Sequence, residues 1–362
     1  VISKSDKKFY NVILVFIFTL FIFNIFDQTK SYKKIPNFVN SSNKSYQKME
    51  LVIIFDEMSG LTSYESSYES GKEFNIFAKK FFKKHNFEFY SDINSIASNT
   101  VSSLSALLNY TDSVHTRPKV SRVSKNYFID YDLTKSLFFE RFDNISIYQN
   151  MHLNFCNLSY ITKCDNYNPF KKNKYLLGYQ NTFLTKFISL WKLNGSISST
   201  FIWRLFREVR LIDSNLEPEG HKVTFQHLFE KIEEDISSKN YDLIFVHTLV
   251  PHKPYGFNKD CNYDGSLSTL NRYYSIKDNV QQHNLERKCV LVYLDKFLEK
   301  LKKNNTIDNV NFTILSDHGA RIKKKEKSSQ FSTIYAYRDS TTSYKEFEKK
   351  TSIQNVFSDQ YN

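Results

Sequence analysis

Four short runs of mostly apolar residues constrain the fold of this chain more than any other feature. They lie at residues 50–55, 242–246, 311–315 and 331–337. Runs of this length, rich in β-branched and aromatic residues, are typical of strands that are buried on both faces, as in a parallel sheet. A further short strand is expected at residues 87–90.

Segments with a helical spacing of apolar residues separate these strands. They lie at residues 73–84, 101–108, 225–236 and 284–302. Helices that alternate with buried strands pack on both faces of one sheet. We therefore expect an α/β fold with a central, mostly parallel sheet sandwiched by helices.

The composition is that of a globular protein with a basic surface. Hydrophobic residues make up 41% and charged residues 24% of the 362 residues, and the formal net charge is +12. Such a charge can favour anionic partners. The lysines, however, are dispersed or lie on surface-like helices, and no zinc-knuckle, helix-turn-helix or RNP-like pattern accompanies them. We therefore expect a solvated basic surface and no nucleic-acid partner.

The four cysteines exclude some kinds of site. None of them forms a CxxC pair, which argues against a thiolate zinc site and a thioredoxin motif. If the domain faces an oxidising compartment, Cys156 and Cys164 are the better disulfide candidate, and Cys261 with Cys289 is the weaker one.

An uncharged and almost wholly apolar segment covers residues 12–26, with lysines on both sides. As a helix it would be about 22 Å long, which falls short of the roughly 30 Å hydrocarbon core unless flanking aromatic residues extend it. A signal peptide is the rival interpretation, but no small-residue cleavage site follows. We expect a transmembrane anchor at 1–27 and a polar linker at 28–48, with the orientation left open by the flanking lysines.

The remaining chain is long enough for one large domain. We expect it at residues 49–345, with an insertion at about 120–215 that covers or extends the core, and a C-terminal tail at 346–362. The chain begins with Val rather than Met, which keeps open a longer protein with further membrane spans upstream.

Polar side chains of metal-ligating type stand at the ends of three of the four strands. They are Asp56, Glu57, His247, His252, Asp317 and His318. Each alone could be a cap, a turn residue or a structural histidine. Ligands of α/β sheets bind beyond the carboxyl ends of the strands, so these side chains together predict a metal site at one edge of the sheet. Carboxylate and imidazole ligands suit zinc first, with manganese, magnesium or calcium as alternatives.

Four segments carry a resemblance to a known family. They read VIIFDEMSG, SNTVSSLSALL, HTLVPHKPYGF and ILSDHGAR, and the resemblance spans residues 50–340. The series resembles the alkaline phosphatase and sulfatase superfamily. It is most similar to the membrane-anchored, sulfatase-like branch that includes phosphoethanolamine transferases and lipoteichoic-acid-type synthases. The resemblance implies an alkaline phosphatase-like sheet and a metal-dependent reaction.

The resemblance also implies roles for single residues. Asp56, Asp317 and His318 match metal ligands, and Glu57 stands where some members use a second acidic ligand. His252 matches the histidine that contacts the substrate phosphate or a second metal, with His247 as a less certain neighbour. Arg321 could help to hold the phosphate.

Thr100 matches the family's nucleophile, five positions before the small residue Ser105 and at the start of a helix. A hydroxyl needs a metal to stabilise its alkoxide, and a helix N-terminus offers free N–H donors to a phosphoryl group. The alternatives are that Thr100 is a plain N-cap, or that Ser98 or Ser102 is the nucleophile.

Two features depart from the family pattern. No cysteine or serine stands in the C/S-x-P-x-R motif from which sulfatases mature their formylglycine, so sulfate-ester hydrolysis by that route is not expected. Residues 320–339 contain no histidine, whereas family members often supply one there. We infer one firm metal site, and an inactive, degenerate member stays open.

The resemblance implies a metal-dependent transferase. It would move a phospho-head-group from a membrane lipid donor to an envelope glycan or lipid, with the catalytic domain on the periplasmic or extracellular side of a bacterial inner membrane. The alternatives are a phosphate- or sulfate-ester hydrolase and a non-catalytic, membrane-anchored module that binds polyanions.

Overall fold

The computed structural model describes residues 48–112, 120–122, 129–149, 152–166, 220–253, 255–262, 275–322, 327–348 and 351–361. The expected membrane anchor at 1–27 lies outside these ranges, as does the expected linker except for its last residue. In the ranges above, no helix is both long enough and apolar enough to cross a membrane.

The described part of the chain is built on an eight-stranded sheet with the order β11-β2-β10-β9-β1-β8-β5-β7. Its strands are β1 (Met49–Phe55), β2 (Glu88–Asn94), β5 (Ile145–Gln149), β7 (Lys163–Asn166), β8 (Leu243–Thr248), β9 (Val310–Ser316), β10 (Ser332–Arg338) and β11 (Lys345–Phe347). In this sheet β10 runs antiparallel to both neighbours, and the other pairs are parallel. The predicted α/β class and mostly parallel sheet are confirmed.

Each apolar run of the sequence forms a strand, and β1 lies at the centre. Residues 51–55 of β1 have no exposed surface, because β8 and β9 cover both edges and helices cover both faces. A strand in this position can tolerate apolar side chains at every residue, which explains why the sequence shows a continuous run and not an alternating pattern.

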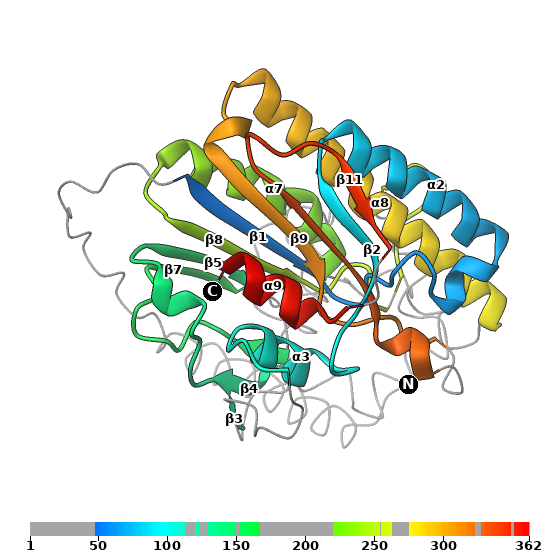
Figure 1. Cartoon of the computed structure of the whole chain (residues 1–362), viewed down its shortest axis with the longest axis horizontal. Helices are drawn as coiled ribbons and strands as arrows, with labels where there is room; N and C mark the ends of the chain where they lie inside the picture. The colour runs from blue at the N-terminus through cyan, green and yellow to red at the C-terminus, as the bar shows by residue number, and fades with distance from the viewer. Residues whose placement is uncertain are drawn as a thin grey trace, which may run out of the picture. The chain divides into compact units, whose positions relative to one another are not determined.

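Helices cover the two faces of the sheet (Figure 1). α2 (Glu69–Lys84), α7 (Gly220–Ser238) and α8 (Ile276–Lys303) share one hydrophobic cluster with the alternate β1 residues 51, 53 and 55. α3 (Thr100–Leu107) and α9 (Ile353–Tyr361) share the other cluster with β1 residues 52 and 54. The side chains of a strand alternate between faces, so β1 supplies both cores.

The chain between 120 and 166 contributes to two sheets. β5 and β7 extend the main sheet beyond β8, and β3 (Val120–Arg122), β4 (Ile129–Leu133) and β6 (His152–Asn154) form a second, three-stranded sheet. The described residues also include four short 3-10 helices, η2 (Tyr64–Ser67), η3 (Phe139–Arg141), η6 (Ile307–Asn309) and η7 (Lys327–Gln330).

Both candidate disulfides are present. Cys156 is bonded to Cys164, which lies in β7, and Cys261 is bonded to Cys289. The second bond joins the loop after β8 to α8, so a loop that follows a central strand is covalently tied to a helix of the covering layer.

The segment expected as a C-terminal tail belongs to the folded domain, which corrects that expectation. α9 buries Ile353, Phe357 and Tyr361, spaced four residues apart, against the sheet. The Tyr361 hydroxyl donates to Glu50 Oε2 at 3.0 Å. A helix of nine residues gives only a weak helical signal in sequence, and the contacts with the sheet stabilise it.

Candidate active site

The three central strands bring their polar ends to one edge of the sheet. β1 lies between β8 and β9, and all three run parallel. β9 ends at Ser316 in register with the end of β1, and β8 carries His247 one residue before its own end. Asp56 and Asp317 directly follow β1 and β9, so they leave the sheet side by side.

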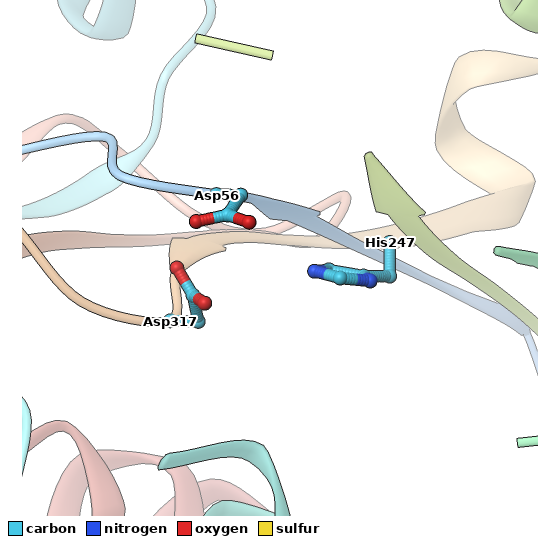
Figure 2. Close-up of side chains that lie close together, drawn as sticks. All are labelled: Asp56, His247 and Asp317. Carbon is cyan, nitrogen blue, oxygen red and sulfur yellow. The ribbon is translucent and has the colours of Figure 1, made fainter. Parts of the chain in front are cut away.

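Asp56, His247 and Asp317 form a group that could hold a metal ion (Figure 2). Each offers a ligand atom within 4.8 Å of the others, and all three are buried. Neither oxygen of Asp56, nor Oδ2 of Asp317, has a hydrogen-bond partner in the described part of the chain. Buried carboxylate oxygens are costly without a donor or a cation, and the arrangement therefore fits a bound cation.

The electrostatics of Asp56 lead to the same conclusion. Burial raises the pKa of Asp56 well above its ordinary value, and the negative charges of Asp317 and Glu57 raise it further. The Arg321 charge and the nearby Thr100 hydroxyl lower it by less. Two carboxylates that lie this close together and are shielded from water repel each other. A divalent cation between them would offset that repulsion.

Asp317 has one oxygen anchored and the other facing the site. Its Oδ1 accepts the backbone N–H of His318 at 2.8 Å and that of Glu57 at 3.2 Å. Oδ2 lies 3.4 Å from His318 Nε2. The two N–H donors fix the orientation of the carboxylate, so the second oxygen points into the site.

His318 is oriented in the manner of a metal-ligating histidine. Its Nδ1 donates to the Gly319 carbonyl at 2.9 Å, which leaves Nε2 for the site. Nε2 lies 3.6 Å from Asp56 Oδ1. A backbone carbonyl on the other ring nitrogen is the usual second partner of a histidine ligand. Gly319 is needed here because a Cβ on it would lie 2.0 Å from the Ser329 carbonyl oxygen.

The donor set fits the metal that the family resemblance implies. Two carboxylates and two imidazoles are available: His247 lies in one group with Asp56 and Asp317, and His318 Nε2 lies 3.6 and 3.4 Å from the same two carboxylates. Zinc takes nitrogen and oxygen ligands of this kind, and manganese accepts them too. His247 was expected to contact substrate, but the structure places it with the two aspartates.

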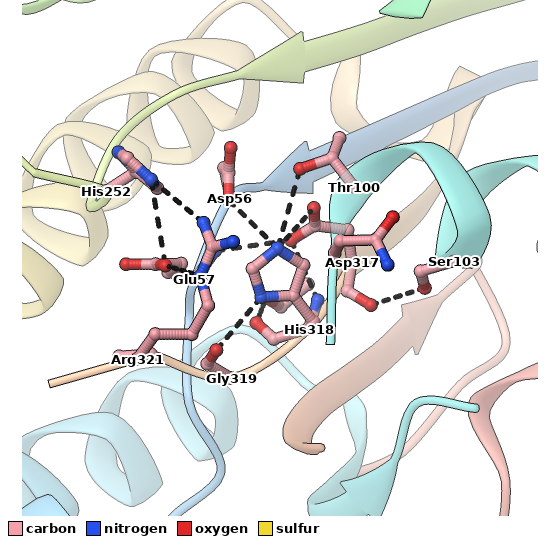
Figure 3. Close-up of polar contacts among 12 residues, drawn as sticks. Asp56, Glu57, Thr100, Ser103, His252, Asp317, His318, Gly319 and Arg321 are labelled. Carbon is pink, nitrogen blue, oxygen red and sulfur yellow. Dashed lines mark hydrogen bonds and ion pairs between the residues drawn. The ribbon is translucent and has the colours of Figure 1, made fainter. Parts of the chain in front are cut away.

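Thr100 lies at the first position of α3, facing this group (Figure 3). Its Oγ1 is 3.5 Å from His318 Nε2. The N-cap of α3 is Asn99, whose side chain accepts the Ser102 N–H at 2.9 Å. The hydroxyl of Thr100 is therefore not used as the cap, which was the alternative to a role as nucleophile.

Ser103, one turn into α3, ties this helix to the metal-type group. Its Oγ donates to the backbone carbonyl of Asp317 at 2.5 Å and lies 2.8 Å from Ser95 Oγ. Ser316 links the loops that follow β1 and β9, because its Oγ accepts the Met58 N–H and donates to the His318 carbonyl, each at 2.8 Å. Ser103 and Ser316 lie within the motif segments SNTVSSLSALL and ILSDHGAR, but the motifs predicted no role for them.

Glu57, Arg321 and His252 form a second group beside the first (Figure 3). Glu57 Oε1 accepts from Arg321 Nε at 2.7 Å and lies 3.6 Å from His252 Nε2. Arg321 Nη2 lies 3.2 Å from His252 Nε2. Glu57, expected as a metal ligand, thus directs its carboxylate to Arg321 in this structure.

The charge of Glu57 is maintained by its neighbours. Burial alone would raise the pKa of Glu57, but the charges of His252, His318 and Arg321 outweigh it and lower the pKa to about 2. Arg321 is half-exposed, and its guanidinium also interacts electrostatically with Asp56 and Asp317 of the first group. In this position Arg321 can bind an anion that lies next to the metal-type group.

A second set of metal-type residues on α2 and α8 has a structural explanation. His85, Asp295 and Glu299 lie close together, but Lys84 Nζ is 2.7 Å from Asp295 and 3.2 Å from Glu299. This lysine already supplies the positive charge, so the cluster is an ion-pair network between two helices.

Comparisons with known proteins now bear on the fold. No protein-family model matches the sequence, and no curated protein is significantly similar to it. Solved structures do match. Ps i-CgsB in complex with k-i-k-neocarrahexaose has 14% identity, covering 86% of this chain and 70% of that chain, with a TM-score of 0.52. Ps i-CgsB alone gives 13% identity, the same coverage and a TM-score of 0.51.

A third match is the integral membrane protein lipooligosaccharide phosphoethanolamine transferase A from Neisseria meningitidis. It has 12% identity, covering 88% of this chain and 55% of that chain, with a TM-score of 0.46. This chain therefore spans about half of that protein. The likeness to Ps i-CgsB establishes a shared α/β fold, and identities this low do not transfer a reaction.

Proposed function

We propose that this protein is a metal-dependent transferase that moves a phospho-head-group through a covalent intermediate on Thr100. The observation that carries the proposal is the position of the Thr100 hydroxyl. It is buried at the start of α3, 3.5 Å from His318 Nε2 and beside the buried carboxylates of Asp56 and Asp317, three of whose four oxygens lack a hydrogen-bond donor in the described part of the chain. A hydroxyl in such a place is suited to nucleophilic attack.

Asp56, Asp317, His318 and His247 would hold the metal. When bound, zinc would lower the pKa of the Thr100 hydroxyl and offset negative charge that develops in the transition state. The residues of the chain supply the rest of the chemistry. Thr100 Oγ1 loses its proton and attacks phosphorus, the bond from phosphorus to the lipid oxygen of the donor breaks, and that oxygen takes up a proton so that the lipid leaves as an alcohol.

The phosphoryl oxygens would face two sources of positive charge. The first turn of α3 offers backbone N–H groups that have no partner within the helix. Arg321 offers a guanidinium that reaches over from the loop after β9, with His252 beside it. In the second step an acceptor hydroxyl displaces Thr100 from phosphorus, which frees the enzyme.

Two sequence features favour transfer from a lipid to an envelope acceptor. The apolar segment at residues 12–26 would bring the site to a membrane substrate, and the similarity of the four motifs is strongest to the transferase branch. The chain also lacks the C/S-x-P-x-R motif, so a formylglycine-dependent sulfatase is not supported.

The test is intact-protein mass spectrometry of the zinc-loaded full chain after incubation with phospholipid donors. We expect a head-group adduct on Thr100, which Thr100→Ala abolishes. Turnover should fall about 10³-fold or more in Thr100→Ala, on the order of 4 kcal/mol in the barrier, and Thr100→Ser should keep part of the activity.

Other outcomes separate the alternatives. Bare phosphate on Thr100 with rapid turnover of a generic ester would identify a hydrolase. A protein that binds no zinc or manganese and is unaffected by Asp317→Ala would remove both enzymatic functions and leave a polyanion-binding module.

A further inference from the structure

Three buried polar side chains of α8 face the loops of the site. His283, Glu286 and Arg287 are spaced three and four residues apart, so they lie on one face of the helix. None has any exposed surface. It costs free energy to bury polar or charged side chains on a helix face unless each one is paired. The partners of these three side chains therefore indicate their role.

His283 and Arg287 bind the turn that follows Asp56. His283 Nε2 donates to the Glu57 carbonyl at 3.0 Å, and Arg287 Nη2 donates to the Ser59 carbonyl at 2.5 Å. Glu57 has a φ of 63°, a left-handed conformation that a glutamate adopts only when its surroundings hold it there. The α8 donors supply that restraint on the carbonyl side of Glu57.

Ser59 couples this turn to the loop that carries Arg321. Its Oγ donates to Glu65 Oε1 at 2.9 Å and accepts the Ala320 N–H at 2.9 Å. If the turn after Asp56 shifted relative to α8, both Glu57 and Ala320, the residue directly before Arg321, would therefore move.

Glu286 binds the loop that carries His252. Its Oε1 accepts the N–H groups of Gly256 and Phe257 at 2.6 and 2.8 Å. The disulfide between Cys261 and Cys289 ties the far end of the same loop to α8. The loop is held at two points by one helix.

We propose that this face of α8 positions Glu57, His252 and Arg321 relative to one another, and so sets the anion-binding half of the site. His283, Glu286 and Arg287 act as positioning residues, since their contacts described above reach backbone groups of the two site loops. The inference rests on the proposed function, because it assigns these residues to binding the phosphoryl group and not to holding the metal.

The experiment compares His283→Leu with His283→Gln in the zinc-loaded full chain. Glutamine keeps an N–H donor for the Glu57 carbonyl and leucine does not. Calorimetry gives the Kd for inorganic phosphate, elemental analysis gives zinc per chain, and steady-state kinetics give KM and kcat for a phosphodiester. For His283→Leu we expect a rise of about tenfold or more in Kd and KM, with zinc content unchanged. For His283→Gln, values within about threefold of wild type are expected.

Lys296→Ala is the matched control, because Lys296 lies on the exposed side of the same helix, and it should change none of these values. A folded His283→Leu protein with wild-type Kd and KM would overturn the inference. A His283→Leu protein that loses bound zinc to the same extent as it loses phosphate binding would overturn the inference too, since His283 would then support the metal site.

If His283→Leu does not fold, Glu286→Leu decides. It removes the oxygen that accepts the N–H groups of Gly256 and Phe257, so Kd should rise several-fold, and an unchanged Kd would overturn the inference. A wild-type protein that binds zinc but neither binds phosphate nor turns over the ester would overturn the proposed function and this inference with it.

Discussion

Glu57 and Arg321 show how neighbouring residues divide the charges of the site. Asp56 and Glu57 are adjacent in sequence, but the left-handed turn at Glu57 directs the two carboxylates to different partners. Asp56 joins Asp317 and the histidines, whereas Glu57 pairs with Arg321. A guanidinium held by one carboxylate in this way keeps its remaining N–H groups available for a second anion.

Arg321→Ala is expected to weaken binding of the anionic substrate more than it slows chemistry. KM should rise about 10- to 100-fold, the loss of one charge-assisted contact of roughly 1.5–3 kcal/mol, and kcat should fall less. Steady-state kinetics of zinc-loaded protein measure both values. Arg321→Lys should recover part of the loss, and an unchanged KM in Arg321→Ala would contradict a role in binding the anion.

At the level of elements, α3 depends on its first turn. The helix has eight residues, which is too short to be stable alone in water. Its N-cap bond from Asn99, its serine bond to Asp317 and its buried leucines hold it on the sheet. The same turn presents Thr100 and free N–H groups to the site, so the stability of the helix start and the proposed reaction are linked.

Asn99→Ala should lower both stability and turnover. Removing an N-cap side chain costs about 1 kcal/mol of unfolding free energy, and a frayed first turn would leave Thr100 less well placed. Denaturant unfolding and kcat measure the two effects. Asn99→Ser, which can still cap, is the control, and a stable Asn99→Ala protein with full activity would show that the first turn is held by other contacts.

Across the whole molecule, the metal-type group lies where three central strands end. Asp56, His247 and Asp317 come from positions up to 261 residues apart in the chain (317 minus 56) and are all buried. Repulsion between the two carboxylates opposes the close packing of the strand ends, and the fold tolerates it at the site because a cation can offset it.

Removing the metal should therefore destabilise the whole domain. A metal at 100 times its Kd contributes about 2.7 kcal/mol to folding, so a chelator should lower Tm by several degrees, and added zinc should restore it. Thermal unfolding with and without chelator measures the change. In Asp317→Asn the chelator should have little effect, and an identical Tm for wild type in both conditions would show that no metal is bound there.

The sequence by itself determined the central strands β1, β8, β9 and β10, the first part of β2, most of the helices and the residues at the strand ends, whereas β5, β7, β11 and the small sheet were not predicted. The burial pattern of a strand or helix is written in consecutive residues, so local periodicity suffices. The resemblance placed Asp56, Asp317, His318 and Thr100, and the structure brings these four side chains together. Their roles as ligands and nucleophile stay predictions until metal and adduct are measured.

Tertiary structure alone decided the direction of each side chain and the partners that hold it. The turn at Glu57 sends its carboxylate to Arg321, and strand register brings His247 to the aspartates. His283 and Glu286 give no motif in sequence, because their partners are backbone groups of loops 226 and 30 residues away. Such contacts depend on how distant segments pack, and no local pattern encodes them.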